Sequence, residues 1–385
     1  MAESDDDTDK LEEVDYSSDA RLVTNSDAKD EEIQVIISDN KCISKTTCKW
    51  LIGLFIVIGI AVSWVGATQF TQSTYTDEFD GPFFNVWFST TWMLVCYLGY
   101  FPPAFFLGRN KWHARLIYSE DEAVFGEAGL TLWNYFRLIA PFGICWAVTN
   151  YMYTYALGFI AAADVTALFS SNTAFIYILS ILWLNELITP VKVLATIFSI
   201  AGVVLMAAGD GFLRSTAVGV ALSVGAAIGA ALYKVLFKRF IGDATSGQVS
   251  LFLTCTGAFN LLFLWPVMLT LYLTGIESWD WNEMPWKFLC GSAALSVVFN
   301  FLINFGIAFT YPLFIAIGTV IGIPLNAVVD YIWRDNAFGT LQIIGSVFIV
   351  GGFLLMLIPN KWQDKVTWPR FVRCGCCTRC HHSAL

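Results

Sequence analysis

The sequence predicts an all-α membrane protein: ten transmembrane helices in two inverted five-helix repeats, preceded by a disordered acidic N-terminal tail. Hydrophobic residues make up 56% of the 385-residue chain and its mean hydropathy is +0.61. Both values are higher than in soluble domains of this length. Ten apolar stretches lie between Trp50 and Pro359. Because no water pairs with backbone groups inside a bilayer, stretches of this length must form helices.

The basic residues between these stretches predict the orientation. With the N-terminus in the cytosol, 16 Lys and Arg fall in cytosol-facing segments, and the opposite side has only Arg214, Lys287 and Arg334. Lys and Arg in short loops stay on the cytoplasmic side. This asymmetry therefore predicts the number of spans and places both termini in the cytosol. The choice between Golgi, endosomal and plasma membrane stays open.

The predicted spans follow one another closely along the chain. The connection 71–82 holds three acidic residues and no Lys or Arg, and the longer connection 108–134 mixes both charges. The other connections are short. The spans cover residues 50–70, 83–107, 133–156, 159–183, 190–209, 215–238, 248–273, 286–309, 312–333 and 338–358.

Residues 1–45 are predicted to form a disordered acidic tail in the cytosol. The segment from Met1 to Asn40 holds 14 Asp and Glu against three Lys and Arg, a balance of −11 within a total of −9. Such a segment buries too little apolar surface to order itself. It either keeps the chain solvated or serves regulation or sorting.

Residues 361–385 are predicted to form a second cytosolic tail, rich in cysteine. Cysteines next to a membrane are sites of S-palmitoylation, whereas their spacing here does not match a zinc knuckle. Three interpretations of this tail stay open: palmitoylation, metal binding, and no specific role. We assign no residues to a metal site. The cysteines of this tail are Cys374, Cys376, Cys377 and Cys380.

A weak internal repeat divides the spans into halves, residues 46–210 and 211–360. Glu186 and the stretch Gly202-Val203-Val204-Leu205 align with Asp335 and the stretch Gly351-Gly352-Phe353-Leu354, always 149 positions apart. Because each half has five helices, the second half lies upside down in the membrane. Inverted repeats are typical of secondary transporters, whose binding site lies near the midplane between the halves.

The stretch from Tyr155 through Glu186 to Leu205 resembles the drug/metabolite transporter superfamily of the EamA type. Leu232–Lys238 and the Gly322-Ile323-Pro324-Leu325 stretch with Asp330 resemble the F branch of solute carrier family 35, in particular the members described as thiamine transporters. The resemblance covers residues 48–360. It implies two inverted five-helix repeats, a thiamine-like substrate, and a homodimer formed through the fifth and tenth helices.

Ionisable side chains inside a span are costly and are therefore candidate binding residues. Asp164 is a counter-ion for a cationic substrate or a proton acceptor, or it only stabilises a helix N-terminus or forms a structural pair. Asp330 has the same interpretations, with Arg334 as its structural partner. Lys234 reaches the membrane surface along its aliphatic stem, contacts an anion, or closes a gate by pairing with an acid of the first four spans.

Amides and aromatic rings complete the candidate substrate site. Amides within spans either bond neighbouring helices or contact substrate, and aromatic walls attract planar cations, worth roughly 0.5 to 2 kcal/mol per contact. Of the tyrosines in the third span, Tyr151 and Tyr155 are candidates. The amide candidates are Asn150, Asn172, Asn300, Asn304 and Asn326.

The sequence therefore predicts a carrier and not an enzyme. It holds no nucleophile elbow, phosphate loop or metalloprotease motif, and it predicts no cofactor and no nucleic-acid partner. We expect a small-molecule substrate, most directly a thiamine-like organic cation moved by alternating access. A nucleotide-sugar or other anionic-metabolite antiporter is the alternative, because Lys234 offers one deep cation. A non-transporting scaffold or sorting protein that acts through the acidic tail is the third.

Overall fold

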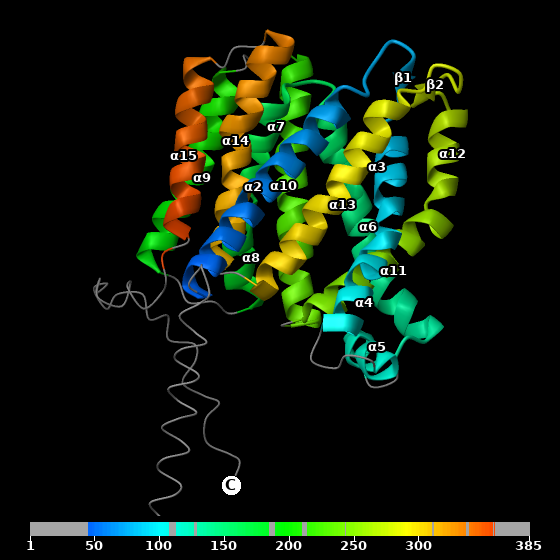
Figure 1. Ribbon diagram of the computed structural model, residues 1–385. Helices are drawn as coiled ribbons and strands as arrows, with labels where there is room; N and C mark the ends of the chain where they lie inside the picture. Colours follow the sequence, from blue (N-terminus) through cyan, green and yellow to red (C-terminus); the bar gives the residue numbers. More distant parts are fainter. Residues whose placement is uncertain are drawn as a thin grey trace, which may run out of the picture. The chain divides into compact units, whose positions relative to one another are not determined.

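The computed structural model describes residues 45–107, 113–126, 129–184, 189–209, 214–242, 244–309, 312–335, 339–356 and 358 (Figure 1). The predicted cysteine-rich tail, with Cys374, and the acidic tail up to residue 44 lie outside these residues. The chain divides into residues 1–51 and 52–385. Of the first unit the structure describes only the opening of α2. All contacts given below lie within the second unit.

The described chain is mostly helical, and each predicted span falls on one helix or on consecutive helices. The helices are α2 (Lys45–Gln72), α3 (Pro82–Thr91), η1 (Trp92–Leu94), α4 (Val95–Leu107), α5 (Ala114–Glu122), η2 (Ala123–Phe125), α6 (Leu132–Ala156), α7 (Ala162–Ser170), α8 (Asn172–Trp183), α9 (Pro190–Gly209), α10 (Arg214–Phe240), α11 (Ser246–Phe263), α12 (Trp265–Leu273), α13 (Trp286–Phe309), α14 (Pro312–Arg334) and α15 (Thr340–Met356).

Several of these helices suit a bilayer. Among the described residues, five are long and apolar enough to cross a membrane, and the bent pair of α11 and α12 makes a sixth candidate. Large apolar side chains such as Leu98 and Val204 are exposed on the helix surfaces, as expected where lipid covers them. The helical membrane fold is therefore confirmed, while ten spans and an inverted repeat stay predictions.

Two sides of the bundle can be named from the structure. Strands β1 (Phe79–Asp80) and β2 (Ser278–Trp279) pair antiparallel and join the connection after α2 to the connection after α12. We call this end the strand side and the opposite end, where α5 lies, the α5 side (Figure 1). The sequence did not predict this strand pair. Its position corresponds to the side predicted to face away from the cytosol.

The predicted second span is broken, because η1 separates α3 from α4. Thr254 of α11 stabilises the break: its hydroxyl accepts a hydrogen bond from the backbone N–H of Tyr97 at 3.0 Å and donates to the carbonyl of Met93 at 3.4 Å. Gly257 lets α11 come this close, since a Cβ there would lie 3.0 Å from the backbone nitrogen of Leu94. A side chain of a neighbouring helix thus adds hydrogen bonds to backbone groups at the break.

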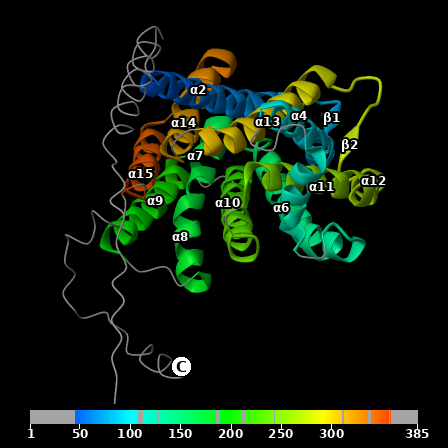
Figure 2. The ribbon, with the colours of Figure 1, turned by 60° about the horizontal axis from the view of Figure 1, so that its bottom comes forward.

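Small residues let α9 and α15 pack closely together. A Cβ on Gly202 would lie 2.6 Å from the carbonyl oxygen of Gly345, and one on Gly352 would lie 2.6 Å from the carbonyl oxygen of Ala195. Such close backbone approach is typical of helix pairs in membranes. Figure 2 shows this pair beside α8, with α10 lying between α8 and α6.

Candidate functional site

A small cavity lies where the 3-10 break of the second predicted span meets α2, α6 and α13. Its volume is about 90 Å³. None of the side chains that line it carries a formal charge. They are Trp64, Ala67, Ser89, Thr90, Met93, Trp146, Asn150, Ser296, Phe299 and Asn300. The cavity therefore brings together two of the predicted site residues, Asn150 of α6 and Asn300 of α13.

The two amides in the cavity are oriented by their own helices. Asn150 Nδ2 donates to the carbonyl of Trp146 at 2.8 Å, and Asn300 Nδ2 donates to the carbonyl of Ser296 at 2.8 Å. A carbonyl only accepts, so these bonds fix which end of each amide is nitrogen. No described group donates to either Oδ1. Both amides therefore offer oxygen acceptors to a solute in the cavity.

Aromatic rings supply the rest of the cavity wall. The ring of Trp64 lies 4.7 Å from that of Phe299 and 5.8 Å from that of Phe169, stacked on the latter at an interplanar angle of 26°. The Trp146 indole N–H donates to Thr90 Oγ1 at 3.4 Å, which holds the indole against α3. Ring faces fixed in this way attract planar and cationic groups. Trp64 was not among the predicted site residues, although an indole within a span and away from the interface was a signal.

A second group of predicted residues lies in a buried hydrogen-bond network toward the strand side. Asp330 and Asn326 of α14 are fully buried, and Gln69 Nε2 donates to Asn326 Oδ1 at 3.0 Å and to Asp330 Oδ1 at 2.8 Å. Arg334 pairs with Asp330 at 3.0 Å and also donates to Gln69 Oε1. The Asp330–Arg334 pairing considered from the sequence is thus present. Gln69 was not among the predicted site residues, because amides near the ends of membrane spans are common.

This network also reaches α7 and α6. The backbone N–H of Ala163 donates to Asp330 Oδ2 at 2.8 Å, so a side chain of α14 caps the N-terminus of α7. Asn326 Nδ2 donates to Thr166 Oγ1 at 3.0 Å, and the Thr166 hydroxyl lies 3.3 Å from the Tyr153 hydroxyl. The network therefore ties α2, α6, α7 and α14 together.

Asp164 lies outside the cavity, in the first turn of α7. It is buried, and Gln342 Nε2 of α15 donates to its Oδ2 at 3.2 Å. A carboxylate in the first turn is favoured by the helix dipole. The structure thus contains the helix-stabilising geometry that was one of the interpretations of this residue from the sequence.

The remaining candidates form separate contacts. Lys234 of α10 is exposed, and its Nζ donates to Asn172 Oδ1 at 3.2 Å. Tyr151 and Tyr155 of α6 stack with centroids 5.6 Å apart. The side chain of Asn304 lies outside the described residues. Among the predicted site residues whose side chains the structure describes, only Asn150 and Asn300 line the same cavity.

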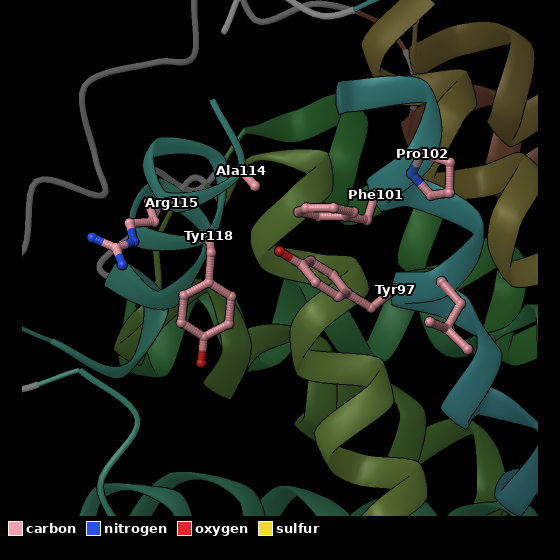
Figure 3. A pocket seen from close by; sticks show the side chains of 7 residues that line it. Tyr97, Phe101, Pro102, Ala114, Arg115 and Tyr118 are labelled. Atoms are coloured by element: carbon pink, nitrogen blue, oxygen red, sulfur yellow. The ribbon is translucent and has the colours of Figure 1, made fainter. Parts of the chain in front are cut away.

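A larger cavity of about 480 Å³ lies between α4 and α5, away from the predicted residues. Figure 3 shows Tyr97 and Phe101 of α4 facing α5, while the guanidinium of Arg115 points away from them. The hydroxyl of Tyr97, which lines the cavity, donates to Asp121 Oδ2 at 3.0 Å. Burial raises the pKa of Asp121, which lies on α5 outside the predicted spans, to about 6.

Glu277, on the connection between α12 and α13, was also missed by sequence reasoning. It is 2% exposed, and its Oε1 and Oε2 accept the backbone N–H groups of Phe83 at 2.7 Å and Phe84 at 3.3 Å. Burial raises its pKa to about 7. Nothing in the local sequence distinguishes it from the exposed acid Glu283 in the same connection, because its burial comes from α3.

No family model matches the chain. The chain is similar to solute carrier family 35 member F3 of Mus musculus, with 39% identity over 312 residues that cover 81% of this chain and 74% of that protein. It is 38% identical over 361 residues to solute carrier family 35 member F4 of Homo sapiens, covering 93% and 68%. It is 24% identical over 353 residues to the thiamine-repressible mitochondrial transport protein THI74 of Saccharomyces cerevisiae, covering 80% and 91%.

Proposed function

The chain belongs to the F branch of solute carrier family 35 and is an integral, multi-pass membrane transporter; from this premise we propose that it carries a thiamine-like organic cation by alternating access. The observation that carries this proposal is the uncharged, aromatic cavity between α6 and α13. We further propose that Asn150 and Asn300 contact the solute there.

The chemistry of the cavity favours a cationic solute with hydrogen-bond donors. Two amide oxygens accept from N–H groups, and the faces of Trp64 and Trp146 attract a planar cation. An anionic phosphate or nucleotide sugar calls instead for several converging Lys or Arg side chains, and none lines this cavity. The yeast relative is named a transport protein that thiamine represses, which adds modest support for this substrate class.

The size of the cavity supports a carrier that changes shape. A volume of about 90 Å³ holds only about three water molecules, whereas sites for small organic molecules span roughly 300 to 1,000 Å³. The solute therefore enters only after the lining helices move apart. The break at η1 lies directly in the wall, and broken helices at the binding site are typical of secondary transporters.

A screen in proteoliposomes tests the proposal. Purified protein is reconstituted, and uptake of labelled thiamine is compared with counterflow of labelled nucleotide sugars, with protein-free liposomes as the control. Thiamine uptake that saturates and that unlabelled thiamine inhibits supports the proposal. Nucleotide-sugar counterflow without thiamine uptake overturns it.

Asp164 separates two versions of this proposal. In one, its carboxylate becomes the counter-ion of the cation after α7 leaves Gln342; in the other, it only stabilises the N-terminus of α7. Loss of thiamine uptake in Asp164→Asn, with normal protein yield, supports the first version. Unchanged uptake removes Asp164 from the site.

One observation favours a second candidate, an antiporter of nucleotide sugars or other anionic metabolites. Lys234 is exposed although it lies on α10 between α6 and α8, and its only described partner is the neutral Asn172. An anion would find a cation there that no carboxylate of the described residues neutralises. Nucleotide-sugar counterflow that Lys234→Ala abolishes would establish this function.

A further inference from the structure

The larger cavity, between α4 and α5, has the size of a binding site and has no part in the function proposed above. Its volume of about 480 Å³ lies within the roughly 300 to 1,000 Å³ of sites for small organic molecules. Helix α4 contributes Tyr97, Leu98, Phe101 and Pro102 to the lining, and α5 contributes Ala114, Arg115 and Tyr118. Arg115 is the one formally charged residue of this lining. The rest of the wall is apolar or phenolic.

One wall of the cavity continues into the surface of α4 that suits lipid. Leu98, Pro102 and Phe106 follow each other at intervals of four residues, so they lie on one face of the helix, and all three are exposed. Leu98 and Pro102 also line the cavity. A hydrocarbon chain that covers this face of α4 therefore has a direct way into the cavity.

The cavity lies at a depth that a lipid reaches from the membrane surface. Phe101 lies nearly two turns before the end of α4 at Leu107, about 9 Å along the helix axis. Helix α5 lies at the same end of the bundle, on the α5 side (Figure 1). The sequence predicts that this side faces the cytosol, and anionic lipids concentrate in the cytoplasmic leaflet.

Arg115 places a positive charge at the rim of the cavity. It is exposed and forms no ion pair with another described residue. Its guanidinium points away from Tyr97 and Phe101, out of the apolar part of the cavity (Figure 3). Guanidinium groups bind phosphate oxygens well. An apolar floor with a cationic rim matches the acyl chain and the phosphate of a phospholipid.

The acidic residues of α5 leave this rim positive, because they lie in the last turn of the helix, whereas Arg115 lies in the first. Two of them also have partners. Asp121 accepts a hydrogen bond from the Tyr97 hydroxyl. Glu122 accepts one from the backbone N–H of Leu130. The positive end of the helix dipole adds to the charge of Arg115 at the rim.

We propose that the cavity between α4 and α5 binds one anionic glycerophospholipid from the leaflet on the α5 side. Part of an acyl chain lies between Tyr97, Phe101 and Tyr118, and the phosphate lies against the guanidinium of Arg115. This lipid site is separate from the cavity between α6 and α13, and it does not depend on which solute the protein carries.

Tyr97 connects the lipid site with the break in the second predicted span. Its backbone N–H is bonded by Thr254 of α11 beside the break, and its side chain lines the lipid site. A bound lipid therefore rests on the residue through which α11 holds the start of α4.

Photocrosslinking in nanodiscs tests the proposal. The full-length protein is reconstituted with a small fraction of phosphatidylserine that carries a diazirine in one acyl chain, and in parallel with phosphatidylcholine that carries the same chain. After irradiation, mass spectrometry of peptides locates the label. Residues 97–102 and 114–118 should carry more label from phosphatidylserine than from phosphatidylcholine. Helix α9, which also exposes apolar side chains such as Val204, should take label from both lipids alike.

Two variants separate the rim of the site from its floor. Arg115→Gln should reduce the preference for phosphatidylserine about fivefold, because one contact between a cation and an anionic lipid is lost. Arg137→Gln, the same change at an exposed residue in the second turn of α6 that does not line the site, should keep the preference of the parent. Ala114→Trp fills the cavity and should reduce labelling of residues 97–102 by both lipids.

The test stays decisive if Ala114→Trp does not fold, because Arg115→Gln changes an exposed side chain without an ion pair among the described residues. Equal labelling of α4, α5 and α9 by both lipids, or an Arg115→Gln protein with the preference of the parent, overturns the proposal. Labelling that millimolar inorganic phosphate abolishes also overturns it, since the site would then bind free phosphate. Since no transported solute is used, failure of thiamine transport would leave the result unaffected.

Discussion

Asp330 accepts the backbone N–H of Ala163 at 2.8 Å, so that a carboxylate of α14 caps α7 while it pairs with Arg334 of its own helix. The Asp330 side chain is buried, with 1% exposure, whereas that of Arg334 is partly exposed at 24%. Asp330 therefore connects two helices that are remote in sequence, and the stability of the bundle should depend on its charge.

Asp330→Asn should lower the free energy of unfolding by about 2 kcal/mol, less than for a fully buried ion pair, because the partly exposed guanidinium of Arg334 loses its ionic partner. Thermal unfolding in detergent measures the effect. Asp335→Asn is the matched control: Asp335 is exposed and has a φ of 52°, a conformation that Asn tolerates well. Equal melting temperatures for Asp330→Asn and the parent would show that the network contributes no net stability.

Thr254→Val tests how the broken second span is held. The substitution keeps the shape of the side chain and removes the hydroxyl that bonds Tyr97 N and Met93 O. Leaving these backbone groups without that partner should cost about 1 to 3 kcal/mol. Thr270→Val removes a hydroxyl that bonds only the carbonyl of Pro266 on its own exposed helix and should be almost neutral. Comparable losses in both variants would argue against a special role of Thr254.

Gly345→Ala tests the contact between α9 and α15. The added Cβ would lie 2.6 Å from Met206 Cγ and 2.8 Å from the carbonyl oxygen of Gly202, so the helices must separate at a cost of about 1 to 3 kcal/mol. Gly351→Ala, on the same helix, meets only Phe198 Cδ1 at 3.9 Å and should be neutral or slightly stabilising. Melting temperatures of the two variants and of the parent measure the effect. A Gly345→Ala protein that melts at the temperature of the parent would contradict the close contact between α9 and α15.

The stability of the α5 side should fall as the pH rises because of Asp121. Burial raises the pKa of this residue from 3.8 to about 6. Its contribution is therefore present below pH 3.8 and is lost as the pH rises through 6, by at most about 3 kcal/mol. In Asp121→Asn the amide oxygen still accepts from Tyr97, and no proton is lost. Between about pH 4.5 and 7.5, the melting temperatures of the parent and of Glu120→Gln should decrease with rising pH. The melting temperature of Asp121→Asn should decrease less.

The helices were predictable because apolar runs and turn residues are local signals. The predicted spans 190–209 and 286–309 match the bounds of α9 and α13. The break at η1 was not predictable, since its bonds come from Thr254 on a helix about 160 positions away. The strand pair was also missed, because strands of two residues carry no periodic pattern in the sequence.

The candidate site was only partly predictable. Asn150 and Asn300 meet at the cavity, as a polar pair on two central helices suggests. Residue type alone did not show that Asp330 and Asn326 bond Gln69, nor that Asp164 faces α15. Such partners depend on how helices rotate against each other, which a single sequence does not report.

The central claim is that solute binds between α6 and α13, against the oxygens of Asn150 and Asn300. Uptake of labelled thiamine by proteoliposomes containing Asn150→Leu or Asn300→Leu tests it most directly, with Asn282→Leu, the same change on an exposed connection, as the control. Each lost hydrogen bond should reduce uptake at low solute concentration about tenfold, while Asn282→Leu matches the parent. Parent-like uptake by well-folded Asn150→Leu and Asn300→Leu proteins would contradict the claim.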